Sequence, residues 1–232
     1  IKKKIFSKTI LLKQTKKKNF FQQLNKKINI IIQNYKINLI IIDSYFINNT
    51  FQKKLKLFIA KINNTNKDNL NCDLVLNYSF QINNKKSNSK FLVGPSYSLI
   101  QNKFKKIKKF NSKKILITFG GSNTLIHILK TLKCIDLELP NYKIHISTTS
   151  KLFYKILLKH IPNKIAVILN SDLSKIINKY KYEFIISSGG HTLYEIIANK
   201  YPALFLSIYK NQNENIDFLR KNNAAKALKY KA

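Results

Sequence analysis

Short apolar runs alternate with amphipathic stretches along most of this sequence. Apolar residues at helical spacing, beginning at Phe20 and continuing through Leu24, Ile28 and Ile32, mark one face of a helix. Short apolar runs bounded by polar or turn-forming residues are typical of buried strands. In the first half we expect strands at 39–43, 57–62 and 73–77, followed by a last apolar run at 91–95. Strands that alternate with helices predict an α/β fold with mainly parallel sheets.

The second half repeats this alternation more regularly. Strands are expected at 115–119, 143–147, 165–169, 184–187 and 203–208, and helices near 124–133, 150–159, 173–180, 192–199 and 213–221. Ser150 and Ser171 come just before two of these helices, where a side-chain oxygen can cap the first backbone N–H groups. The lysine-rich residues 96–112 lack a clear strand pattern. We therefore expect a first domain at 1–95, a linker at 96–112 and a second domain at 113–232.

Glycine is rare in this chain, and its placement is informative. Of five glycines, four form the pairs Gly120-Gly121 and Gly189-Gly190. Each pair follows an apolar run and precedes a small polar residue and a helical pattern. A strand–glycine–helix turn lets backbone N–H groups approach an anionic ligand closely. In a doubly wound sheet such turns lie at the carboxyl ends of strands, where ligands bind.

Polar side chains near the second pair could complete such a site. Thr192 offers a hydroxyl, and the carboxylate of Glu195, one turn into the helix, could accept hydrogen bonds from a ribose diol beside a diphosphate. The same carboxylate could instead only complement the helix dipole. Asn211 and Gln212 follow a strand, where their amides could bind sugar or phosphate or simply cap a helix. Asp43 ends a strand of the first half and could face the same cleft or start a helix.

Charge and cysteine content narrow the classes of partner. Lys and Arg number 43 against 10 acidic residues, a net charge of +33, which in isolation suggests nucleic acid or an anionic surface as partner. However, Arg220 is the only arginine, and the lysines are spread along the whole chain. We interpret the charge as a solvated lysine surface and expect no specific nucleic-acid partner.

No apolar run is long enough to span a membrane. Cys72 and Cys134 lack metal-type spacing, so we expect reduced thiols in a cytoplasmic protein, with no metal and no cofactor.

Several segments, taken in order, resemble the UDP-2,4-diacetamido-2,4,6-trideoxy-β-L-altropyranose hydrolase family of pseudaminic acid biosynthesis, a bacterial family related to MurG-type glycosyltransferases. They are residues 42–45, 71–77, 93–104, 117–123, 188–195 and 211–212. The most specific part is Gly94-Pro95-x-Tyr97-x-Leu99 together with the later Asn-Gln pair. The resemblance implies a GT-B-like α/β fold, with two Rossmann-like domains whose parallel sheets face a cleft, the first domain being incomplete.

This resemblance also implies an activity and a site. The family hydrolyses a UDP-linked sugar at the anomeric carbon, with inversion, to UDP and the free sugar. The residues expected around the UDP diphosphate and ribose are Gly120, Gly121, Ser122, Gly189, Gly190, Thr192 and Glu195. Asn211 and Gln212 would reach the sugar side. Tyr45, in an Asp-Ser-Tyr segment that begins at Asp43, would stand near the reacting centre.

The sequence also departs from the family pattern. The family's N-terminal Gly-x-Gly-His loop supplies the histidine proposed as catalytic base, and no glycine precedes Gly94 here. With no methionine in the chain, we expect an N-terminal truncation. His191 stands where the family commonly has serine. Two alternatives remain open: a MurG-like GT-B glycosyltransferase, in which an acceptor hydroxyl replaces water, and a degenerate domain that only binds nucleotide sugars.

Overall fold

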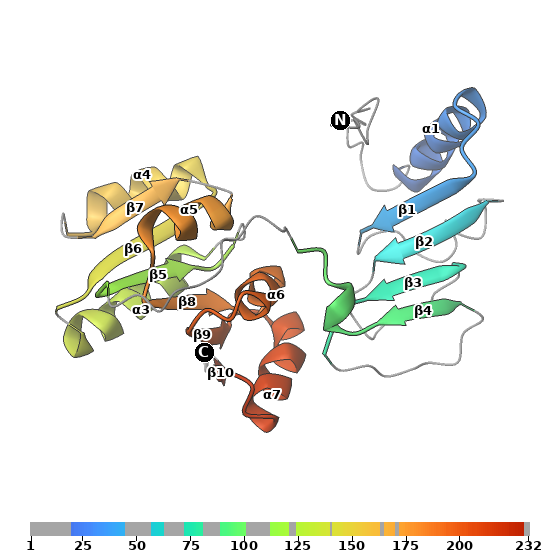
Figure 1. The fold of residues 1–232 in the computed structure, drawn as a ribbon. Coiled ribbons are helices and arrows are strands. Elements are labelled where there is room, and N and C mark those ends of the chain that lie inside the picture. Colours follow the sequence, from blue (N-terminus) through green and yellow to red (C-terminus); the bar gives the residue numbers. More distant parts are fainter. Residues whose placement is uncertain are drawn as a thin grey trace. The chain divides into compact units, whose positions relative to one another are not determined.

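The fold comes from a computed structural model that describes residues 20–44, 57–62, 72–80, 89–100, 112–120, 124–139, 141–162, 165–169 and 172–229. The chain divides into two compact units (Figure 1). One consists of Ile1–Asn77 with Asn83–Val93, and the other of Tyr78–Ile82 with Gly94–Ala232. The second unit therefore includes two segments that directly follow strands of the first.

The first unit contains one helix and a parallel sheet in its described part. The strands lie in the order β1-β2-β3-β4, with bounds Leu39–Asp43, Phe58–Ile62, Leu74–Asn77 and Lys90–Val93. Helix α1 (Phe20–Asn34) places Leu24, Ile28 and Ile32 against buried Ile42 and Ile59. The apolar face expected for this helix is thus the face that covers the sheet.

The second unit contains a six-stranded parallel sheet in the order β10-β9-β8-β5-β6-β7. The strand bounds are Lys114–Thr118 for β5, Lys143–Thr148 for β6, Ala166–Leu169 for β7, Phe184–Ser188 for β8, Ala203–Ser207 for β9 and Lys226–Lys229 for β10. The helices between them are α3 (Leu125–Glu138), α4 (Lys151–His160), α5 (Leu173–Tyr180), α6 (His191–Ala198) and α7 (Asn213–Lys221).

Side-chain alternation along the strands separates two faces of this sheet. One face packs against α3 and α4. Its buried members are Ile115, Ile117, Phe119, Ile144, Ile146, Ile165 and Ile186 from the sheet and its strand ends, with Ile128, Leu132, Ile135 and Leu157 from the two helices. Parallel connections are right-handed, so α5, α6 and α7 lie on the opposite face. Two-sided burial explains why these strands read as nearly continuous apolar runs.

The order of the strands creates a switch point between β5 and β8. From β5 the chain moves outward through β6 and β7, then crosses back to β8 and continues outward on the other side to β9 and β10. The connections after β5 and β8 therefore lead away in opposite directions, which leaves a crevice at their carboxyl ends. Gly120 follows β5 and Gly189-Gly190 follow β8, so both glycine turns belong to this crevice.

Most of the expected elements are confirmed, with two differences. Strand β10 was not expected, because its sequence Lys-Ala-Leu-Lys lacks a strand-like apolar run. The expected cap Ser171 is wrong, because Asp172 caps α5, whereas Ser150 caps α4 by accepting from the Phe153 N–H at 3.3 Å. The parallel α/β class is confirmed.

The expected domain boundaries at 1–95 and 113–232 remain predictions. Within the expected linker, residues 101–111 lie outside the described part, and η2 (Pro95–Tyr97), a single 3-10 turn, overlaps its start. No helix in the described ranges is both long enough and apolar enough to cross a membrane.

Candidate functional site

A small, open pocket lies at the crevice of the six-stranded sheet. The carboxyl ends of β5 and β6 and the first turns of α5 and α6 form its walls. Its lining residues are Thr118, Gly120, Ser147, Thr148, Thr149, Leu173, Thr192 and Glu195. Hydroxyl groups, helix N-termini and one carboxylate thus converge on one open space, which suits a ligand with both anionic and hydroxyl groups.

Three hydroxyl side chains lie side by side across the strands beneath this pocket. Thr118 is in register with Ser147 on β6 and with Ser187 on β8, so all three belong to the same face of the sheet. Thr118 and Ser147 line the pocket. The Ser187 hydroxyl is fully buried and has no hydrogen-bond partner within the described residues. Such a row gives the pocket a polar floor where an ordinary core would be apolar.

Glu195 supplies the carboxylate of the pocket. Its pKa is raised, first by burial and also by the nearby Asp172, while the adjacent His191 acts in the opposite direction. Burial disfavours the ionised carboxylate because protein atoms replace water around it. Hydroxyl donors from a ligand would restore the hydrogen bonds that this ionised carboxylate loses.

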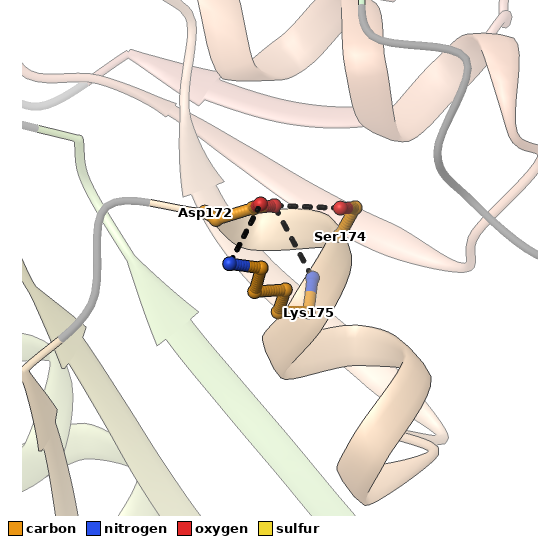
Figure 2. Close-up of polar contacts among 3 residues, drawn as sticks. All are labelled: Asp172, Ser174 and Lys175. Atoms are coloured by element: carbon orange, nitrogen blue, oxygen red, sulfur yellow. Dashed lines mark hydrogen bonds and ion pairs between the residues drawn. The ribbon is translucent and has the colours of Figure 1, made fainter.

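The first turn of α5 is held in place by its cap (Figure 2). The Ser174 hydroxyl donates to Asp172 Oδ1 at 2.6 Å, and the Lys175 N–H donates to the same oxygen at 3.3 Å. Lys175 Nζ lies 3.8 Å from Asp172 Oδ2. This network fixes the start of the helix, and with it Leu173 in the wall of the pocket.

The two glycine turns differ in what they require. Gly120 has φ +77°, a backbone conformation that residues with a side chain rarely adopt. No atom lies within 4 Å of the position that a Cβ would take there, so the backbone and not crowding favours glycine. At Gly189 a Cβ would lie 3.1 Å from Ile216 of α7. Gly190 is the N-cap of α6 and provides no side-chain cap, so the first N–H groups of the helix have no cap from that residue. Backbone conformation thus favours glycine at position 120 and close packing favours it at 189, whereas a Cβ at position 190 would make only ordinary contacts.

A polar network behind the second turn holds it in position. In η3 (Lys210–Gln212), a 3-10 turn, Gln212 is buried, and its Oε1 accepts from the Ile208 N–H at 3.0 Å. The Asn215 amide donates to the Gly189 carbonyl at 2.9 Å, and its Oδ1 accepts from the Tyr194 hydroxyl at 2.9 Å. Asn215 escaped the sequence reasoning, although it follows Gln212 by only one helical turn.

The structure brings together only some of the residues expected at the site. Gly120, Thr192 and Glu195 line the pocket, while Gly190 starts α6 and Gly189 packs beneath it.

The other expected residues lie elsewhere or cannot be placed. Asn211 is exposed on η3, and Asp43 is exposed at the carboxyl end of β1 in the first unit. Tyr45, Gly121 and Ser122 lie outside the described residues.

Five pocket residues were missed by the sequence reasoning, and one of them is Thr118 at the end of β5. Ser147, Thr148 and Thr149 form a hydroxyl run where an expected strand ends, and that position was the available signal. Leu173 carried no comparable signal. Among the described residues, no group of three or more His, Cys, Asp or Glu side chains could hold a metal ion.

The sequence matches no protein-family model and no curated protein. Solved structures do match the fold. The spinosyn rhamnosyltransferase SpnG aligns with TM-score 0.62 and 14% identity, over 90% of this chain and 63% of its own. The Streptomyces sp. SF2575 glycosyltransferase SsfS6, complexed with thymidine diphosphate, aligns with TM-score 0.54 and 10% identity. This alignment covers 90% of this chain and 62% of SsfS6. A co-structure of S. aureus MnaA with UDP aligns with TM-score 0.59 and 14% identity, and the alignment covers 89% of this chain and 67% of MnaA.

These similarities establish the fold of the chain. At such low identities they carry no information on substrate or activity. The chain spans less than two thirds of the length of SsfS6 and SpnG. The two parallel sheets and the alignment over 90% of the chain with SpnG and SsfS6 show that the chain has the GT-B fold of these glycosyltransferases.

Proposed function

We propose that this chain binds UDP and a UDP-linked sugar in the pocket of its second unit. The observation that carries the proposal is the convergence of Gly120, Thr192 and Glu195 at the switch point between β5 and β8. The start of α6 offers N–H groups to a diphosphate, and Glu195 offers a carboxylate to a ribose diol. The many surface lysines favour capture of an anionic ligand.

We further propose that the chemistry is hydrolysis at the anomeric carbon, as in the family that the sequence resembles. Water attacks C1 of the sugar and loses one proton to solvent, while the C1–O bond breaks and UDP leaves with the bonding electrons. N–H groups at the start of α6 stabilise the negative charge that develops on the diphosphate. Asn211, which is exposed, and Gln212, whose Oε1 accepts from the Ile208 N–H, remain the proposed contacts on the sugar side. Tyr45 and Asp43 remain proposed contributors from the first unit.

A glycosyltransferase is the second candidate, because SpnG and SsfS6 are described as a rhamnosyltransferase and a glycosyltransferase. In that reaction an acceptor hydroxyl replaces water, and the pocket binds the nucleotide in the same way. The two reactions therefore differ in what occupies the space beside C1. A domain that binds nucleotide sugars without turnover is the third outcome.

Release of UDP separates these candidates. The full-length protein is incubated with the UDP-linked 2,4-diacetamido-2,4,6-trideoxy sugar, without any acceptor, and UDP is measured over time. Steady release that falls in a Glu195→Ala variant supports a hydrolase. Release only after an acceptor is added supports a transferase, and binding without release in either case supports the degenerate domain.

A further inference from the structure

Two short chain segments, each of which follows a strand of the first unit, contact the same helix of the second unit, α6. Residues 78–80 follow β3, residues 94–100 follow β4, and Asn77 and Val93 at the ends of these strands are paired in register. Both segments belong to the compact unit that contains α6. Their contacts on α6 lie in its first turn, which begins immediately after the glycine turn.

His191, the first residue of α6, contacts both segments. Its Nε2 lies 3.0 Å from the Leu99 carbonyl oxygen, which can only accept, so Nε2–H is the donor. The Tyr78 ring meets the His191 ring edge-on, with centroids 5.5 Å apart and planes at 77°. One imidazole next to Gly190 thus joins the segment after β3 to the segment after β4.

A second path leads from residues 78–80 to the same glycine turn. The Tyr78 ring also meets the Tyr194 ring edge-on at 5.2 Å, and Phe80 stacks on Tyr194 at 5.1 Å. Phe80 stacks in turn on Phe218 of α7 at 4.7 Å. The Tyr194 hydroxyl donates to Asn215, whose amide donates to the Gly189 carbonyl. The aromatic contacts therefore continue into hydrogen bonds that fix the turn.

We propose that His191 and Tyr194 are positioning residues that couple occupancy of the glycine turn to the seating of residues 78–80 and 94–100. A ligand on the N–H groups after Gly190 restrains the first turn of α6. That restraint passes through His191 to Leu99 and Tyr78, and through Asn215 and Tyr194 to Tyr78 and Phe80. Neither side chain needs to touch the ligand for this role. The inference rests on the proposed nucleotide binding at this turn.

Amide hydrogen exchange, with UDP as the probe, tests the coupling. The reporters are the N–H groups of Tyr97, Ser98 and Ile100, whose hydrogen bonds go to Gly94, Pro95 and Ser98 within the segment itself. In the wild-type chain, UDP is expected to slow their exchange by roughly fivefold or more, the lower range of ordinary coupling between sites. In His191→Phe, which keeps a ring but loses the donor, the ligand-free exchange rises roughly fivefold, as expected for one lost hydrogen bond.

Further variants separate positioning from general loosening. His191→Gln retains an amide donor and is expected to restore slow exchange in part. Tyr194→Phe keeps the ring, loses only the hydroxyl, and is expected to weaken the response of residues 78–80 to UDP. His160→Phe is the matched control, since His160 Nδ1 lies 2.9 Å from the Ile156 carbonyl oxygen of its own helix, α4. Its exchange pattern at the reporters should equal that of the wild type.

The outcomes distinguish this inference from the proposed function. If UDP binds but leaves the reporters unchanged, or if His191→Phe responds like the wild type, the coupling is wrong and nucleotide binding stands. If UDP does not bind at all, the proposed function fails. The role of His191 is then decided by comparing amide exchange in ligand-free His191→Phe and ligand-free wild type. Equal exchange in His191→Phe and wild type then overturns the role of His191, whereas faster exchange supports it as an anchor of residues 94–100.

Discussion

Gly189 and Ile216 approach so closely that a side chain at position 189 would require Ile216 to shift by a few tenths of an ångström. A Cβ there would lie 3.1 Å from both Cγ1 and Cδ1 of Ile216 and 3.2 Å from Cβ of Gln212. Ile216 is completely buried in α7, so the packing around it has to accommodate any shift of its side chain. The glycine turn after β8 is therefore set by packing against α7 as well as by its proposed ligand.

Gly189→Ala is expected to destabilise the chain by about 1–3 kcal/mol, the usual cost of overpacking. Unfolding in urea measures the change. Gly190→Ala is the matched control, because its Cβ would meet Gln212 Nε2 at 3.5 Å, an ordinary contact. We expect stability close to wild type in the control. Equal loss in both variants would contradict the assignment of the tight contact to position 189.

Ser187→Ala tests the buried hydroxyl of the polar floor. An unpartnered buried hydroxyl costs about 1–3 kcal/mol, so its removal should leave stability unchanged or raise it. Thermal unfolding of the ligand-free chain measures this. Marked destabilisation would show that Ser187 makes a bond that the ligand-free geometry lacks. Ser207→Ala is a useful contrast, because the Ser207 hydroxyl donates to Asn213 Oδ1 and also lies 3.2 Å from the Tyr209 carbonyl oxygen, and its loss should destabilise.

Asp172→Ala should cost about 1 kcal/mol, because it removes the side-chain cap of α5. Asp172→Asn keeps an acceptor oxygen in the same place and should restore most of the loss. Chemical denaturation of the two variants gives the comparison. If both variants lose the same stability, the charge of Asp172 matters more than its hydrogen bonds to Ser174 and Lys175.

The sequence predicts the fold well and the site only in part, for physical reasons. Strands buried on both faces leave apolar runs that are easily located, as in β5 and β8. Strand β10 lies at the sheet edge with Ala227 buried and lysines at both ends, so its position depends on backbone pairing with β9. Side-chain rotamers cannot be inferred from the sequence either. The sequence does not reveal, for example, that Gln212 Oε1 accepts from the Ile208 N–H.

The pocket hydroxyls illustrate a further limit of sequence reasoning. Ser147, Thr148 and Thr149 end β6, and serine or threonine at the end of a strand has many uses. Their relevance becomes visible only when the strand order places β6 beside β5. The glycine pairs were informative from the outset, because conformation, close packing and ligand access each favour a residue without a side chain.

Glu195→Gln should change the dependence of stability on pH. The Glu195 pKa is raised, mainly by burial, so the folded chain holds this proton more tightly than the unfolded chain. Its favourable contribution is complete below the unfolded pKa and is lost as pH rises through the folded pKa. The variant should therefore be more stable than wild type at pH 7, by less than about 1 kcal/mol because the group is half exposed. Thermal unfolding at pH 4 and pH 7 checks this, and a stabilisation that persists unchanged at pH 4 would contradict it.

Calorimetric titration with UDP and 2′-deoxy-UDP tests the nucleotide site most directly. The wild-type chain should bind UDP about tenfold or more tightly than the deoxy ligand, as expected for a hydrogen bond to a charged carboxylate. Glu195→Ala should bind both ligands weakly and with equal affinity, while Glu214→Ala, a carboxylate of α7 outside the pocket, should behave as wild type. No binding of UDP, or a preference for UDP that survives in Glu195→Ala, would contradict the proposed site.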